Sequence, residues 1–117
     1  MKWHHYDAIL RELFVMEKRK PHYDLATVQA QFAKPAGYRI TVTAQDFAFG
    51  VLALDRAGVV SLVGDVRQRH FEKSMTSVAD HRIWQDVYNL PYEDMMLYLK
   101  FTKDDDGFYL LISLKEK

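Results

Sequence analysis

The sequence predicts an α+β protein in which helices from the first half of the chain pack on an antiparallel sheet formed by the second half. Two patterns predict this plan. Apolar residues recur at three- and four-residue spacing in stretches before residue 64, whereas strand-like segments run from Phe71 to the end. The chain has 117 residues, 49% of them hydrophobic, which is enough for one domain with one modest core.

The first fifteen residues are predicted to form a helix that precedes the domain. Trp3, Tyr6, Ile9 and Leu13 belong to one apolar stripe at helical spacing. The following stretch, 16–21, is charged and ends in proline, so it is predicted to be a connector. We therefore expect an N-terminal helical extension over residues 1–15 and a single domain over residues 16–117.

Two short helices are predicted in the region that follows, separated by a strand. Asp24 is a suitable N-cap for a helix over 25–34, which Pro35 would end. Residues 38–43 alternate between apolar and polar, as expected of a strand with one exposed face. Thr43 is then placed to cap a helix over 44–53.

A third helix and a run of strands complete the plan. Asp55 is placed to cap a helix over 56–63 that Gly64 would terminate. Residues 73–76 and 83–88 are predicted to be two strands joined by a turn at 79–81.

The clearest prediction is the last hairpin, formed by 97–102 and 108–115 around a turn at Asp104–Gly107. Its inner side is expected to be apolar and to include Leu110 and Ile112. Strict alternation then places Leu111 on the outer side. Its outer side is expected to carry four polar residues: Tyr98, Lys100, Ser113 and Lys115.

Composition excludes several classes of function. No cysteine is present, which excludes disulfides, thiol catalysis and cysteine-ligated zinc. Sixteen basic residues balance sixteen acidic ones, and a neutral chain is not the usual footprint of a nucleic-acid binder. The charge is uneven, however, with basic residues gathered at 18–20, 67–73 and 115–117. No long apolar run or secretory signal pattern is present, so we expect a cytoplasmic protein with no membrane association.

Four polar residues on the predicted strands are candidates for chemistry: Lys73, Gln85, Tyr98 and Lys115. Each comes from a different strand, and adjacent strands are only about 4.8 Å apart, so the four converge if their faces agree. Gln85 is the difficult member, because Ile83 and Val87 share its face and resemble core residues. The alternative is that these side chains are a solvated sheet face with no catalytic role.

No metal site or cofactor is expected. His22, His70 and His81 are isolated from one another, and His4–His5 are adjacent rather than four apart. Asp104–Asp106 lacks the alternating ligand spacing of a calcium-binding loop and suits a hairpin turn.

One stretch resembles the signature of a known family. Residues 73–88 read KSMTSVADHRIWQDVY, which is similar to the central motif of the motility quorum-sensing regulator (MqsR) toxins. Residues 16–22 (MEKRKPH), 98–100 (YLK) and 113–117 (SLKEK) resemble the beginning and the last hairpin of the same family.

The resemblance implies a RelE-like fold and an endoribonuclease that cuts mRNA, without the ribosome, at short GC-containing sites. It also implies a cognate antitoxin with a zinc-binding part and a helix-turn-helix part. The family's functional positions fall on Lys73, Gln85, Tyr98 and Lys115 of this sequence. Three further residues are expected to contact the RNA substrate: Arg69, Tyr88 and Lys100.

The implied reaction needs no metal, because the RNA's own 2′-hydroxyl attacks the adjacent phosphate while the protein supplies positive charge and moves protons. Two departures from the family pattern subtract positive charge near the expected site: Glu72 and the acidic stretch 89–94. The alternative function is therefore a catalytically weakened binding module that acts through its antitoxin as a transcriptional corepressor.

Overall fold

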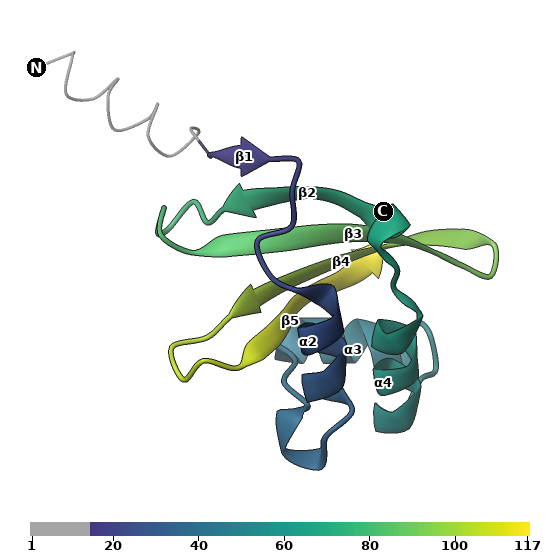
Figure 1. The fold of residues 1–117 in the computed structure, drawn as a ribbon. Helices are drawn as coiled ribbons and strands as arrows, with labels where there is room; N and C mark the ends of the chain where they lie inside the picture. Colours follow the sequence, from purple (N-terminus) through teal and green to yellow (C-terminus); the bar gives the residue numbers. More distant parts are fainter. Residues whose placement is uncertain (1–14) are drawn as a thin grey trace, which may run out of the picture.

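The computed structural model describes residues 15–117, so the helix predicted over residues 2–15 lies outside the described part except for its last residue. Within this part, the chain forms three α-helices, two short 3-10 helices and one sheet (Figure 1). In chain order the elements are β1 (Glu17–Lys18), α2 (Leu25–Phe32), η1 (Pro35–Gly37), α3 (Val42–Gly50), α4 (Arg56–Asp65), η2 (Gln68–His70), β2 (Phe71–Thr76), β3 (Trp84–Tyr92), β4 (Met95–Lys103) and β5 (Tyr109–Glu116).

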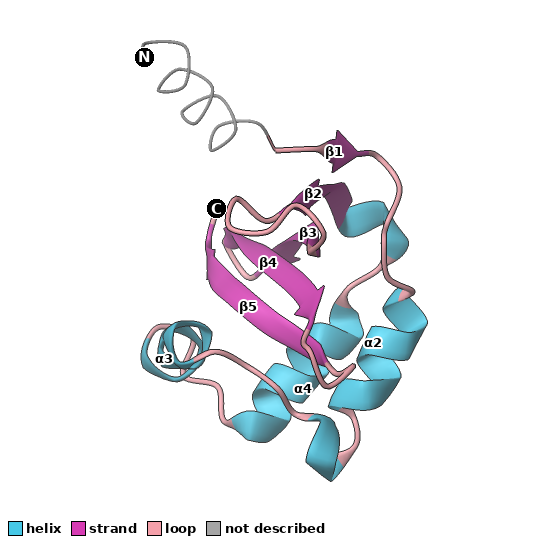
Figure 2. Cartoon of the chain, turned by 90° about the vertical axis from the view of Figure 1, so that its left-hand side faces the viewer, coloured by secondary structure: helices cyan, strands magenta, loops and turns pink. Residues whose placement is uncertain are grey.

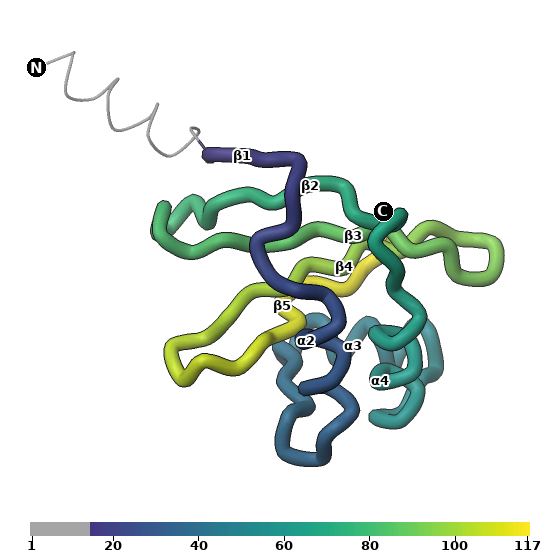
Figure 3. Tube along the Cα trace, viewed as in Figure 1, coloured from purple at the N-terminus to yellow at the C-terminus, as the bar shows by residue number. Residues whose placement is uncertain are grey.

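The sheet is an antiparallel meander in the order β1-β2-β3-β4-β5. The chain folds back on itself from β2 to β5 through three hairpin turns, which the tube in Figure 3 makes easy to follow. The predicted α+β class is confirmed. The prediction that 16–21 is only a connector is wrong, because Glu17 and Lys18 pair with Met75 and Ser74 of β2. Two residues are too few to show a strand pattern.

The helix caps follow local chemistry. The side chains of Asp24 and Asp55 accept hydrogen bonds from backbone N–H groups at the starts of α2 and α4, as predicted. Thr41, not Thr43, caps α3, so that helix begins two residues earlier than expected. Gly64 lies inside α4, which ends one residue later.

The strand predicted over 38–43 does not form. Ile40 makes only an isolated parallel bridge with Leu111, supported by backbone bonds from Thr41 N–H to the Leu111 carbonyl and from Leu111 N–H to the Arg39 carbonyl. The segment is diverted because Thr41 starts a helix. Its bridge partly pairs the outer edge of β5, which would otherwise expose unpaired backbone groups.

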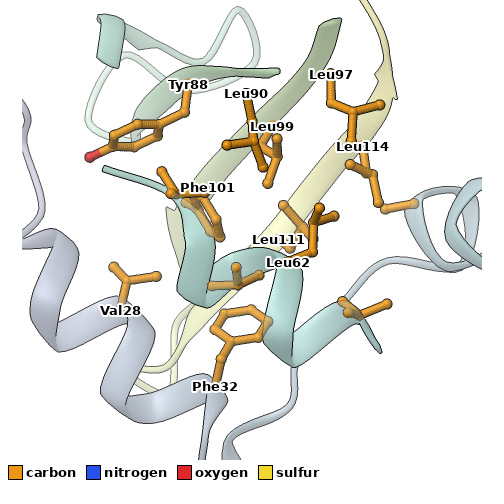
Figure 4. Packing of buried hydrophobic residues seen from close by; sticks show 14 of the residues in the cluster. Val28, Phe32, Leu62, Tyr88, Leu90, Leu97, Leu99, Phe101, Leu111 and Leu114 are labelled. Carbon is orange, nitrogen blue, oxygen red and sulfur yellow. The ribbon is translucent and has the colours of Figure 1, made fainter. Parts of the chain in front are cut away.

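All three α-helices lie on one side of the sheet, α2 and α4 beneath it and α3 against β5 (Figures 1 and 2). The core forms between these layers. Figure 4 shows side chains of the sheet, among them Tyr88, Leu99 and Phe101, meeting Val28 and Phe32 of α2 and Leu62 of α4. No helix within residues 15–117 has both the length and the apolar character needed to cross a membrane.

A β-bulge corrects the predicted faces of the last hairpin. Lys100 pairs with Ser113, but the next residue, Phe101, pairs with Leu111, so Ile112 is an extra residue in β5. The bulge turns Leu111 into the core, where it is fully buried, whereas strict alternation places it on the outer side. Residues after the bulge keep the predicted alternation.

The strand β3 is longer than predicted, continuing through Asn89–Tyr92 instead of ending in a loop. A tight turn then leads into β4, with Glu93 at a φ of 53°. The extension matters for the site because it pairs Asn89 with Tyr98.

Asp86 fixes the segment before α2 to the sheet. Its side chain is 1% exposed and accepts hydrogen bonds from the backbone N–H groups of His22 and Tyr23 and from the Ser74 hydroxyl at 2.6 Å. A buried carboxylate with this many donors is well compensated. Asp86 is therefore a structural residue of the helix-covered side.

Candidate active site

The sheet face opposite the helices, called here the open face, carries all four residues singled out as candidates for chemistry. Lys73 pairs with Val87, Met75 pairs with Gln85, and Tyr98 pairs with Lys115. Directly paired residues point to the same side of a sheet, and alternation along each strand links the pairs. The open face therefore carries Lys73, Gln85, Val87, Asn89, Tyr98, Lys100, Ser113 and Lys115.

The most compact part of this face is a tyrosine contacted by two lysines. The Lys115 ammonium lies 5.0 Å from the ring centroid of Tyr98, and the Lys100 ammonium lies 5.7 Å from it. Both distances are within the range of a cation–π contact. Two positive charges and one phenol therefore meet at the junction of β4 and β5.

Lys73 stands on the other side of the face, on β2. Its ammonium forms an ion pair with the Glu17 carboxylate of β1, with a nitrogen-to-oxygen distance of 3.0 Å. Between Lys73 and Lys100 lies Val87, which is fully buried although no helix within residues 15–117 covers this side. We infer that the aliphatic stems of the neighbouring lysines cover it, leaving their charged ends at the surface.

This arrangement resolves the difficulty with Gln85. Val87 does share the face of Gln85, but it is an apolar residue in the floor of the open face, not part of the helix-covered core. Gln85 lies four residues from Asn89, the partner of Tyr98, which corresponds to about 13 Å along β3. The four candidate residues thus form an elongated strip and do not converge on one point.

A carboxylate also reaches this face. A bulge in β2 between Phe71 and Lys73 accommodates Glu72, whose side chain accepts a hydrogen bond from the Lys117 ammonium at 3.2 Å. Burial alone would raise the pKa of Glu72, but hydrogen bonds from Lys117 and Asn89, together with nearby positive charge, lower it. Glu72 is therefore held as an anion beside the strip. The neighbouring Asn89 Oδ1 is buried without a hydrogen-bond partner.

The surroundings on the open face shift the pKa values of Tyr98 and Lys100 in opposite directions. Burial, and then the negative charge of Glu72, raises the pKa of Tyr98. Burial, and then the positive charges of Lys115 and Lys73, lowers the pKa of Lys100. Tyr98 is therefore held as a neutral phenol able to donate a proton or a hydrogen bond, and Lys100 loses its proton more readily than an ordinary lysine.

One residue expected to contact substrate is placed elsewhere. Tyr88 lies on the helix-covered side, near Phe101 (Figure 4). It is 1% exposed and packs edge-to-face against Phe71 and Phe101. The prediction that Tyr88 binds substrate is therefore wrong, because a ligand on the open face cannot reach it. Its place in the alternation of β3, with Leu90, was the signal that it belongs to the core.

Arg69 and Trp84 lie outside the strip. Arg69 is exposed on η2, immediately before β2 and off the sheet. Trp84 stacks on His22 at a centroid distance of 5.3 Å, with the Lys18 ammonium 4.3 Å from its ring. The Trp84 ring is thus already in contact with two residues of its own chain, His22 and Lys18.

Three residues of the site were missed from the sequence: Glu17, Val87 and Asn89. Glu17 lies in the stretch expected to be a connector, and only its pairing with β2 brings it to Lys73. Val87 was assigned to the core because it is apolar. Asn89 lies one residue beyond the strand predicted over 83–88, although its alternation with Val87 continues the pattern of that strand.

Two cavities lie away from the strip. One, of about 450 Å³, lies between the end of α2 and the start of α4, and the other, of about 400 Å³, lies between α2 and the β4–β5 turn. The candidate site lies on the open face itself, where Tyr98 and Lys100 are partly buried and Lys115 is exposed. Such a surface, with several lysines around a tyrosine and an amide, suits an extended, phosphate-bearing polymer better than a small enclosed ligand.

The fold and this face therefore define the class of small α+β proteins with a cationic sheet surface suited to a polynucleotide. The family model described as motility quorum-sensing regulator, toxin of MqsA, matches residues 20–116. The mRNA interferase toxin MqsR of Escherichia coli (strain K12) is 37% identical over 102 residues, covering 87% of this chain and all of that protein. The chain belongs to the motility quorum-sensing regulator toxin family.

Proposed function

We propose that this toxin is an mRNA interferase that cleaves messenger RNA on the open face of its sheet. Membership of the family and the name of the E. coli relative support the activity, an endoribonuclease. The observation that supports the location is the shared face of Lys73, Gln85, Tyr98 and Lys115. These side chains come from four strands, and none of them belongs to the hydrophobic core.

The proposed chemistry is attack by a 2′-hydroxyl on the adjacent phosphate, without a metal ion. Lys73 and Lys115 supply positive charge to the phosphate as it gains negative charge in the transition state. Gln85, at the far end of the strip, holds a phosphate or a base edge and so fixes the register of the strand. Tyr98, kept neutral by its raised pKa, donates a hydrogen bond to the same phosphate.

Four finer features are part of the proposal. We propose that the helix-on-sheet arrangement is the RelE-like one, that cleavage is independent of the ribosome, and that it falls at short GC-containing sequences. We also propose that the protein acts in the cytoplasm, where its messenger RNA substrate is. Two further residues are proposed to contact the RNA: Lys100, in the middle of the strip, and Arg69, on η2 immediately before β2.

The family description, toxin of MqsA, implies that a toxin of this family has an antitoxin partner. We propose that the cognate antitoxin combines a zinc-binding part with a helix-turn-helix part that binds DNA. A pull-down of the tagged toxin with the product of the neighbouring reading frame tests this. Zinc in the purified complex and specific binding to its own promoter are the expected results.

One observation favours the alternative, a catalytically weakened module that acts as a corepressor through its antitoxin. Two carboxylates on or beside the open face pair with lysines, Glu17 with Lys73 and Glu72 with Lys117. Each pair offsets positive charge that RNA would otherwise meet. These pairs are partly exposed, and such pairs contribute only about 0–1 kcal/mol, so incoming phosphate can replace them. We therefore favour the active enzyme.

The experiment is cleavage of end-labelled RNA by the purified protein in EDTA. The proposal predicts cuts that leave 5′-hydroxyl ends, and loss of cutting in Lys115→Ala and Tyr98→Phe with folding and antitoxin binding intact. Lys103→Ala, on the same strand as Tyr98 but beside Tyr109, is the matched control and should cut normally. Intact RNA at high protein excess would favour the corepressor module, and wild-type rates in both site variants would contradict the location.

A further inference from the structure

Three lysines share the open face, but their surroundings differ. Lys73 is paired with a carboxylate, that of Glu17, at 3.0 Å. Lys115 is exposed near the end of β5. Lys100 is partly buried in the middle of the sheet, and among residues 15–117 no carboxylate forms an ion pair with it. Lys100 therefore differs from the other two lysines in having neither a carboxylate partner nor an exposed position.

The strand register explains why Lys100 differs. It pairs with Val87 on one side and with Ser113 on the other, so both neighbouring strands offer it an uncharged residue. Lys73 flanks the same Val87 from β2, which places a cation beyond the valine. Lys115 contacts the Tyr98 ring that Lys100 also contacts, which places a second cation beside it.

The charged and titratable groups around Lys100 come from β1, β2, β4 and β5 and from the terminal Lys117. β3 contributes only neutral residues: Gln85, Val87 and Asn89. The ionisable groups are Glu17 of β1, Glu72 and Lys73 of β2, Tyr98 of β4, Lys115 of β5 and the terminal Lys117. Both carboxylates are already paired, Glu17 with Lys73 and Glu72 with Lys117, so the balance at Lys100 is positive. Burial and these charges lower its pKa.

We propose that Lys100 is a catalytic residue, the general base that removes the proton from the attacking 2′-hydroxyl, while Lys73 acts as a cation and Lys115 as a cation that also protonates the leaving 5′-oxygen. This inference rests on the proposed function and adds a role beyond RNA contact for Lys100. A lysine that acts as a base must be neutral before it reacts, and its nitrogen must lie among the groups that hold the phosphate. Lys100 meets the second condition by its position between the other two lysines.

The step balances without any further reagent. The neutral Lys100 amine takes the 2′-hydroxyl proton, the 2′-oxygen forms a bond to phosphorus, and the bond from phosphorus to the 5′-oxygen breaks. The leaving 5′-oxygen takes a proton from the Lys115 ammonium. The products are a 2′,3′-cyclic phosphate and a 5′-hydroxyl, and proton exchange with water restores both lysines.

The first test replaces Lys100 with arginine. Arginine keeps the positive charge but does not deprotonate in proteins. Under the proposal, Lys100→Arg loses about 10²–10⁴-fold in single-turnover cleavage while binding a 2′-deoxy-substituted, uncleavable RNA as tightly as wild type. If Lys100 only holds phosphate, the arginine variant keeps most of its cleavage rate, and that result overturns the proposal.

The second test uses the absence of cysteine from the chain. Lys100→Cys provides a unique thiol, and alkylation with 2-bromoethylamine converts it to an amine of nearly lysine length but lower basicity. The unmodified variant should be inactive, and the alkylated protein should recover cleavage with the rising limb of its pH–rate profile moved to lower pH. Lys103→Cys, treated in the same way, should keep the wild-type profile.

The outcomes separate this inference from the proposed function. Recovery with an unmoved profile would show that Lys100 supplies only charge, which overturns the base assignment and leaves the nuclease intact. Failure of the wild-type protein to cut RNA in EDTA overturns the proposed function, and the assignment of Lys100 with it. A fold check by circular dichroism on each variant excludes loss of structure as the cause.

Discussion

The two faces of the sheet use the same strands in different ways. On the helix-covered face the side chains of Tyr88, Leu99 and Phe101 are at most 1% exposed and contact one another or the helices. On the open face Tyr98 and Lys100, which alternate with Leu99 and Phe101 along β4, are only partly buried. Substitutions at neighbouring positions in sequence should therefore separate stability from activity.

The largest effect on stability is expected on the covered face. Leu99→Ala removes a fully buried side chain from the centre of the core and should lower the free energy of unfolding by about 2–5 kcal/mol. Urea denaturation measures it. Tyr98→Phe, one residue away on the open face, is the comparison and should change stability by less than about 1 kcal/mol. Equal losses in the two variants would contradict the division between the faces.

On the open face, substitutions should lower the cleavage rate strongly and change stability little. Lys73→Gln is expected to lower the cleavage rate by about 10²–10³-fold, because one cation that stabilises the transition state is removed. Its stability should change little, since the ion pair with Glu17 is partly exposed. Single-turnover cleavage and urea denaturation on the same sample test both halves. A large loss of stability with unchanged cleavage would refute the role given to Lys73.

Asp86 provides an intermediate case, because it is polar but belongs to the covered side. Asp86→Ala leaves the N–H groups of His22 and Tyr23 and the Ser74 hydroxyl without their acceptor, and should cost about 1–3 kcal/mol of stability. Hydrogen exchange should show faster exchange at His22 and Tyr23, whose amide protons this carboxylate holds. Unchanged protection there would mean that other contacts secure the segment before α2.

The smallest expected effect concerns Glu72. Its pKa is lower in the folded than in the unfolded state, so its contribution to stability is present above the unfolded pKa and is lost as pH falls through the folded pKa. Glu72→Gln should therefore be slightly less stable than wild type at neutral pH and equal to it in strong acid. The same variant should bind RNA several-fold more tightly, because a negative charge leaves the open face. Weaker RNA binding would show that Glu72 contacts the substrate.

The parts of the fold that depend on local chemistry could be predicted from the sequence. Asp24 and Asp55 cap helices by bonding to N–H groups three residues away, so a short window of sequence contains the whole signal. Thr41 and Thr43 both suit a cap, and the choice of Thr41 comes with its hydroxyl bond to the Ile112 carbonyl, a contact distant in sequence.

The parts that depend on strand pairing could not be predicted. β1 is two residues long, and the bulge at Ile112 appears only when β4 and β5 are aligned. The residue types of the candidate site could be predicted, because four polar side chains on predicted strands indicate a surface with a function beyond packing. The shape of the site could not be predicted, since the order of the strands decides that Lys100 is central and that Gln85 lies at one end.

The most direct test of the central claim is to locate RNA on the protein. A 2′-deoxy-substituted oligonucleotide binds without being cut, and valine methyl signals in NMR spectra report where it lies. The signal of Val87, in the floor of the open face, should shift on binding, and the signals of Val59 and Val63, buried residues of α4 on the other side of the sheet, should not. Shifts at Val59 and Val63 with an unmoved Val87 signal would place the RNA on the helical side and contradict the account.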